Sequence, residues 1–150
     1  MEITGLAVIF QASPVFLPAI GLLISPFSTL PVMLAAMYSI YSGILSFICG
    51  GIILFFISPQ EAIIFLFTTG LLGLILGITL KRSFLFSWFI SSVALFIGII
   101  LMTYTIGMTA FTEFAEQFPI YITFIIFILF SFIYSGAWIL AAKKILKRFI

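Results

Sequence analysis

The polar side chains that could carry chemistry in this chain are few and stand apart. Gln11 lies near the middle of the first apolar stretch, between Ala7 and Pro14. A buried amide without a partner costs about 1 to 3 kcal/mol. Gln11 should therefore bond a neighbouring helix, a carbonyl freed by Pro14 or Pro18, or a ligand. A structural role is favoured, and the amide is also the first candidate for a ligand contact.

The carboxylates have simple structural explanations. Glu61 closes segment 58–61, Ser-Pro-Gln-Glu, in which a serine N-cap, a proline and an N3 glutamate form a capping box at a helix start. Glu113 and Glu116 fit a solvated helix face. These structural roles are favoured, and a ligand role stays open for Glu61 and Glu113.

Catalytic and metal chemistry lack the residues that they require. The chain contains no Asp, Asn or His and a single cysteine, Cys49, which we interpret as a packing residue. Ser-His-Asp and Cys-His catalysis, His or Cys metal clusters and an intramolecular disulfide are therefore excluded. The pair Lys81-Arg82 also lacks a glycine-rich run that would cradle phosphates. We expect no enzyme activity, cofactor or metal, and any transport must draw its energy from an ion gradient or another subunit.

The composition is typical of a membrane protein. Of the 150 residues, 65% are hydrophobic and 7% are charged, whereas about a quarter are charged in a soluble domain. A chain of this length cannot bury so much apolar surface in one core, so the lipid bilayer must act as its solvent. The prediction is an all-α polytopic bundle, one domain over residues 1–150, with no nucleic acid as partner.

The apolar stretches and their breaks predict six crossings. The uncharged run from Ile3 to Pro59 would extend roughly 85 Å as helix against a hydrocarbon core of about 30 Å, which requires about three crossings. An alternative with five crossings merges 26–58 into one tilted helix and places the N-terminus outside. The six predicted helices cover residues 4–24, 26–41, 43–58, 59–80, 83–105 and 119–142.

Residues 107–118 form a predicted segment on the external membrane surface. Phe111, Phe114 and Phe118 recur at helical spacing, while Glu113 and its polar neighbours face elsewhere.

The basic residues set the predicted orientation. They occur only at 81–82 and 143–148, two crossings apart and therefore on one side. The positive-inside rule makes that side cytoplasmic, together with both termini. Tyr104 and Tyr121 then lie at the external interface, where a belt role is favoured over a ligand contact. The predicted anchors at the inner interface are Lys81, Arg82, Trp88, Trp138, Lys143 and Lys144.

Small residues recur on the predicted helices, often at four-residue spacing, which lets helix backbones approach closely. Packing within one bundle is favoured over a dedicated subunit interface. The residues assigned to helix packing are Gly43, Gly50, Thr69, Gly73 and Gly77.

Two segments carry a resemblance to known membrane proteins. Residues 26–43 read Pro-Phe-Ser-Thr-Leu-Pro-Val-Met-Leu-Ala-Ala-Met-Tyr-Ser-Ile-Tyr-Ser-Gly. Gly50 and Gly51 follow, and residues 69–82 read Thr-Gly-Leu-Leu-Gly-Leu-Ile-Leu-Gly-Ile-Thr-Leu-Lys-Arg. Over about residues 14–82 this pattern resembles the substrate-binding S components of energy-coupling-factor vitamin transporters. It is equally similar to the uncharacterised YybS-type bacterial membrane proteins.

The resemblance implies a six-helix bundle in a bacterial cytoplasmic membrane, with a ligand pocket that opens outward beneath loop 25–31. Ser28 and Thr29 would be the hydrogen-bonding members of that loop. It also implies a partner module that hydrolyses ATP. S components typically present an Ala-x-x-x-Ala motif to that module, and here Ala7 is followed four places on by Gln11, which departs from the motif.

Two functional hypotheses follow. The first is an S-component-type membrane subunit that takes up a small, largely apolar or aromatic solute with energy from partner proteins. The rival is a non-transporting scaffold or assembly factor for other membrane proteins, favoured by the scarcity of polar residues at mid-membrane. An outward-open cavity at the candidate residues would favour the first, and a solid bundle there the second. The candidate substrate-binding residues are Gln11, Ser28, Thr29, Glu113 and Tyr121.

Overall fold

The computed structural model describes residues 2–149, which form helices and turns with no strand among them. The predicted all-helical class is therefore confirmed. The side chains at 109–111 and 148–149 lie outside the described residues, and with them Phe111 of the predicted surface segment and Arg148 of the basic cluster. The chain divides into two compact units, one that ends at Lys81 and one that begins at Arg82.

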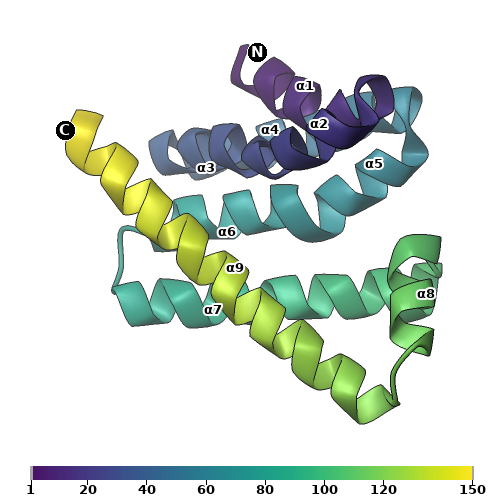
Figure 1. The fold of residues 1–150 in the computed structure, drawn as a ribbon. Coiled ribbons are helices and arrows are strands. Elements are labelled where there is room, and N and C mark those ends of the chain that lie inside the picture. The colour runs from purple at the N-terminus through teal and green to yellow at the C-terminus, as the bar shows by residue number, and fades with distance from the viewer. Residues whose placement is uncertain (1, 150) are drawn as a thin grey trace. The chain divides into compact units, whose positions relative to one another are not determined.

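The first unit consists of helices that fold back on one another (Figure 1). Several helices are joined through a 3₁₀ turn, η1, and a π-helical turn, η2, in place of extended loops. The segments are α1 (Glu2–Phe16), α2 (Pro18–Ile24), η1 (Ser25–Ser28), α3 (Thr29–Tyr38), α4 (Ile40–Ile57), α5 (Pro59–Ile64), η2 (Phe65–Thr69) and α6 (Gly70–Thr79).

The first chain break lies at Leu17, and the prediction of one helix over 4–24 is wrong. Leu17 has φ −137° and ψ 80° because the residue before a proline is disfavoured in the helical region, and Pro18 follows it. The expected loop at 25–31 is instead part of the helical run from Pro18 to Tyr38. Its prolines, Pro26 and Pro31, fall in first turns, where a helix needs no N–H from them.

Ser13 satisfies the backbone around the break. Pro14 has no N–H for the carbonyl of Phe10, one turn earlier in α1. The Ser13 hydroxyl donates to that carbonyl at 2.6 Å and lies 3.0 Å from the carbonyl oxygen of Gly21 in α2. Gly21 lies against the backbone of Ser13 and Pro14, so α2 folds back closely on α1.

Five helices of the described chain are long and apolar enough to cross a membrane. α1, with 15 residues, is a shorter apolar helix. The alternative that merges 26–58 into one helix is wrong, because Ser39 is extended with φ −154° and ψ 138° and separates α3 from α4. The five candidate spans are Pro18–Tyr38, Ile40–Ile57, Pro59–Thr79, Phe84–Ile106 and Ile120–Lys147.

Glycines bring α3 into close contact with both α4 and α6. A methyl group added to Gly43 would lie 2.5 Å from the Cβ of Ala36. Added to Gly73 or Gly77, it would lie 2.5 Å from the carbonyl oxygen of Thr29 or Met33, respectively. Because these glycines have no side chain, α6 packs directly against the α3 backbone, as small residues allow between membrane helices.

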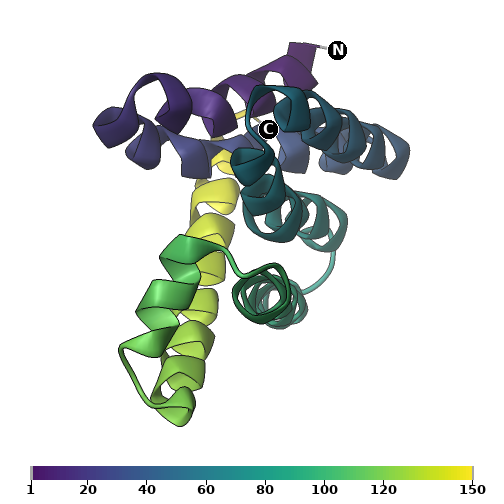
Figure 2. The same ribbon diagram turned by 90° about the vertical axis from the view of Figure 1, so that its right-hand side faces the viewer.

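The second unit is built on the packing of two long helices. It contains α7 (Phe84–Ile100), the π-helical turn η3 (Leu101–Ile106), α8 (Thr109–Glu116) and α9 (Ile120–Phe149). The Trp88 indole of α7 donates to the carbonyl of Phe132 in α9 at 2.9 Å. In Figure 2, α8 lies beside the first turns of α9. The Phe114 ring of α8 stacks on Phe127 of α9, so this amphipathic helix packs partly on protein.

The basic residues of the second unit gather at one end. The Lys143 ammonium lies 4.5 Å from the centre of the Phe84 ring, at the start of α7. The Arg82 guanidinium lies 5.4 Å from the Phe86 ring in the same region. Arg82 and Lys143, one from each basic cluster, therefore lie near the same end of α7, while the side of the membrane that they face stays a prediction.

Replacement of Gly77 by alanine should destabilise the first unit. The new methyl group would press on the Met33 carbonyl, and such overpacking costs typically 1 to 3 kcal/mol. Gly5→Ala is the matched control, since nothing lies within 4 Å of a methyl group there. Thermal unfolding in detergent should show a lower midpoint for G77A and an unchanged or higher one for G5A. Equal midpoints would contradict the close packing of α3 and α6.

Candidate functional site

Gln11 is the centre of a buried hydrogen-bonded cluster in the first unit. Its amide nitrogen donates to the Glu61 carboxylate at 2.8 Å. Its amide oxygen accepts from the Ser28 hydroxyl at 2.8 Å and from the Thr69 hydroxyl at 2.7 Å. Gln11, Ser28, Glu61 and Thr69, called the Gln11 cluster below, are all buried, with Gln11 and Ser28 at 0% exposure.

The cluster lies where the helices of the unit are irregular. Gln11 is in α1, on the same buried face as Ala7 and Ala12. Ser28 ends the 3₁₀ turn η1, and Thr69 ends the π-helical turn η2. Departures from the α-helical pitch change which side chains share a face, and π-helical turns are frequent at functional sites.

Glu61 forms only half of the predicted capping box. The Ser58 hydroxyl accepts from the Glu61 N–H at 3.4 Å, which forms one half of the capping box. The other half is absent, because the Ser58 N–H donates to the Leu54 carbonyl at 2.7 Å. The carboxylate is directed to Gln11 instead, so a structural cap does not account for its position.

Thr29 adds an unsatisfied hydroxyl beside the cluster. It follows Ser28 in the chain and is 0% exposed. Its hydroxyl oxygen has no hydrogen-bond partner among the described residues. A buried hydroxyl in that state costs free energy, so Thr29 is a polar group available to a further partner.

The other two predicted substrate-binding residues belong to the second unit. Glu113 lies in α8 and Tyr121 in the first turn of α9, and both are exposed. Neither takes part in the hydrogen bonds of the Gln11 cluster.

Of the predicted anchors, Trp138 is buried, whereas Lys81 and Lys144 are exposed.

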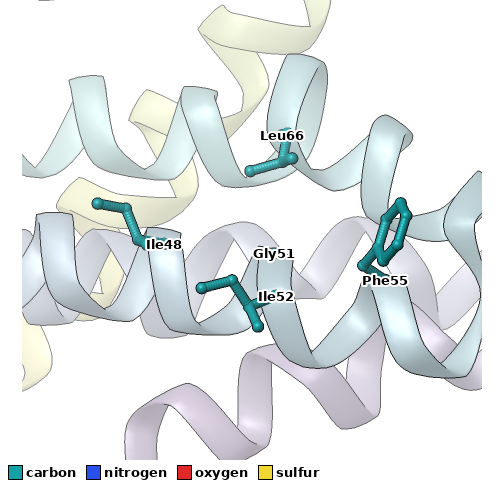
Figure 3. Close-up of a pocket in the computed structure, with 5 residues that line it drawn as sticks. All are labelled: Ile48, Gly51, Ile52, Phe55 and Leu66. Atoms are coloured by element: carbon teal, nitrogen blue, oxygen red, sulfur yellow. The ribbon is translucent and has the colours of Figure 1, made fainter.

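A cavity of about 270 Å³ in the first unit lies away from the cluster. Figure 3 shows its lining of aliphatic and aromatic side chains from α4 and η2. No residue of the Gln11 cluster lines it, and Gln11, Ser28 and Thr29 are closed off from the surface. The lining residues are Ile48, Gly51, Ile52, Phe55 and Leu66.

Two members of the cluster, Glu61 and Thr69, lie in sequence patterns that predict other roles, helix capping and helix packing, respectively. A signal for Glu61 exists in the sequence, since it is the only charged residue from Ile3 to Leu80. An isolated carboxylate in so apolar a region needs a polar partner, and Gln11 is the one amide in the first 59 residues.

Comparison of the chain with protein-family models, with curated proteins and with solved structures gives no match.

Replacement of Gln11 by leucine should lower the free energy of unfolding by about 1 to 3 kcal/mol, because it leaves buried polar partners unpaired. Gln60→Leu is the matched control, since Gln60 is exposed at the start of α5. The combined variant Q11L/E61L should recover part of the loss, because both ends of the pair are then apolar. Chemical unfolding in detergent measures all three, and a loss in Q11L no larger than in Q60L would refute the cluster.

Proposed function

We propose that this chain is a multi-pass membrane subunit that binds a small solute at the Gln11 cluster, in the manner of an S component, with energy supplied by partner proteins. The observation that carries the proposal is the burial of Glu61, the only charged residue of the span 3–80, against the Gln11 amide. The oxygen of that amide accepts from two hydroxyls that lie on irregular helical turns. The cytoplasmic placement of the basic ends belongs to the same proposal.

The cost of the cluster supports a functional role. Ionisable side chains within apolar spans are expensive and commonly mark the path of a substrate or an ion. Well-packed apolar residues of similar volume often serve stability as well as a buried polar pair does. The presence of Glu61 and Gln11 in the apolar core is therefore explained more simply by binding than by stability.

The irregular backbone gives the cluster a means to open. Non-α backbone at membrane depth is tolerated where it is buried in protein or lines a cavity, and interrupted helices surround the binding sites of many transporters. Leu17, η1 and η2 are interruptions of this kind, and Ser28 and Thr69 are carried by two of them. A shift of either turn would break a bond to the Gln11 oxygen and free it for a ligand.

The donor and acceptor set describes the solute. The Glu61 carboxylate and the Gln11 oxygen accept hydrogen bonds, and the hydroxyls of Ser28, Thr29 and Thr69 donate or accept. Apolar side chains of the surrounding helices complete the environment. A compact, largely apolar or aromatic solute that carries an N–H donor and an acceptor on one edge fits this set.

One observation favours the scaffold hypothesis as the second candidate. The hydrogen bonds of the Gln11 cluster close on themselves, and Gln11, Ser28 and Thr29 are 0% exposed and line neither of the two cavities described here. This solid packing at the candidate residues is what the scaffold hypothesis predicts. A polar cluster satisfied internally can simply fix how α1 packs on α5 and thereby shape the surface offered to other membrane proteins.

Thermal-shift measurements on the purified protein separate the two. A panel of vitamins, amino acids and nucleobases should contain a compound that stabilises the fold, by about 2.7 kcal/mol at 100 times its Kd. The shift should fall in Glu61→Gln, which keeps size and shape, and persist in Glu113→Gln, which is exposed in the other unit. No stabilisation across the panel, or equal shifts in both variants, would contradict binding at the cluster and leave the scaffold hypothesis.

A further inference from the structure

The second unit contains a cavity that the proposed function does not use. It measures about 280 Å³ and lies among η3, α8 and the start of α9. Its size is near the lower end of ligand pockets, which begin at about 300 Å³. The polar and aromatic residues that line it are Thr103, Tyr104, Thr112, Glu116 and Phe118.

The turn between η3 and α8 builds this cavity. Gly107 has φ +69°, a left-handed conformation that a glycine adopts without strain, and it ends the long α7–η3 helix. The chain then returns through α8 to α9. Figure 1 shows α8 as a short arm at the end of α7, running across its direction.

The two threonine hydroxyls of the cavity already donate their protons to backbone carbonyls. Thr103 donates to the Ile99 carbonyl at 2.8 Å. Thr112 donates to the Met108 carbonyl at 2.9 Å and lies 3.4 Å from the carbonyl oxygen of Thr103. Both oxygens can therefore offer only lone pairs to a bound molecule. With the Glu116 carboxylate they form a set of acceptors, which favours a positively charged ligand.

No lysine or arginine of the sequence around the cavity competes for that carboxylate. Residues 83–142 contain no lysine or arginine, and their only charged side chains are Glu113 and Glu116. Arg82 precedes the long helix of α7 and η3, which at 1.5 Å per residue is about 35 Å in length. The basic end of the unit is thus several Debye lengths from Glu116 at physiological ionic strength.

Aromatic rings complete a site for a cation. Tyr104 stacks on Phe124 at 6.0 Å between ring centres, so one face of its ring is covered and held. Phe118 packs against Phe114 at 5.4 Å. The faces of such rings attract ammonium groups, most strongly quaternary ones.

We propose that the cavity formed by Tyr104, Glu116 and Phe118 binds an organic ammonium group. Carboxylate and hydroxyl oxygens and aromatic rings are the groups that recognise this ligand class. The ammonium is carried either by a free amine or by the headgroup of a lipid such as phosphatidylcholine. This site shares no residue with the Gln11 cluster, and the evidence for it does not depend on binding at that cluster.

Saturation-transfer NMR with tetramethylammonium and choline tests the site on the full chain in a detergent without ammonium groups. Both cations should show saturable binding, and the neutral isostere 3,3-dimethylbutan-1-ol should bind about tenfold more weakly. Glu116→Gln should weaken choline about five- to tenfold, and Tyr104→Leu by a similar factor. Glu113→Gln, a change on the same helix but outside the cavity lining, should leave binding within about twofold.

Nanodiscs distinguish the two sources of the ammonium. If the lipid headgroup is the occupant, choline binding should be lost in phosphatidylcholine discs and retained in phosphatidylglycerol discs. If a free amine is the occupant, binding should be equal in both. Equal binding of choline and its neutral isostere, or equal affinities in E116Q and E113Q, would overturn the proposal. Near-ultraviolet circular dichroism of each variant confirms that the aromatic packing is intact.

Discussion

The hydrogen bond between Gln11 and Glu61 is the interaction on which the first unit depends. It joins α1 to α5 across 50 residues of sequence, inside a region with no other charged side chain. Both side chains are buried away from water, so their polar atoms need partners within the protein. The positions of Ser28 and Thr69 follow from this need, because the Gln11 oxygen requires donors as well.

The rest of the unit brings these four side chains together. Gly73 lets α6 approach the α3 backbone at Thr29, immediately after Ser28. The turns η1 and η2 contact each other, which places the ends of two interrupted helices around the same amide. The small residues and the irregular turns are thus parts of one arrangement, in which close backbone packing makes room for a polar centre.

Features set by neighbouring residues in the chain could be predicted from the sequence, whereas features set by the packing of distant helices could not. The helix start at Pro59 and the need of Gln11 for a partner follow from the chain itself, and both are observed. Segment 25–31 contains two prolines and polar residues typical of a loop, yet it is helical, because its prolines lie in first turns. The identity of the partner, Glu61, could not be derived, because a capping box gave that residue a sufficient local explanation.

Solid-state NMR of the protein in bilayers can detect the contact between the Gln11 amide and the Glu61 carboxyl group itself. With ¹⁵N-glutamine and ¹³C-glutamate labels, in a Gln60→Ala/Gln117→Ala background that removes the amides adjacent to Glu61 and Glu116, dipolar recoupling reports side-chain nitrogens close to carboxyl carbons. If the two side chains are hydrogen-bonded, a cross-peak between the Gln11 side-chain amide and the Glu61 carboxyl carbon is expected, and it should disappear in Gln11→Leu. The absence of that cross-peak, or its persistence in Gln11→Leu, would contradict it.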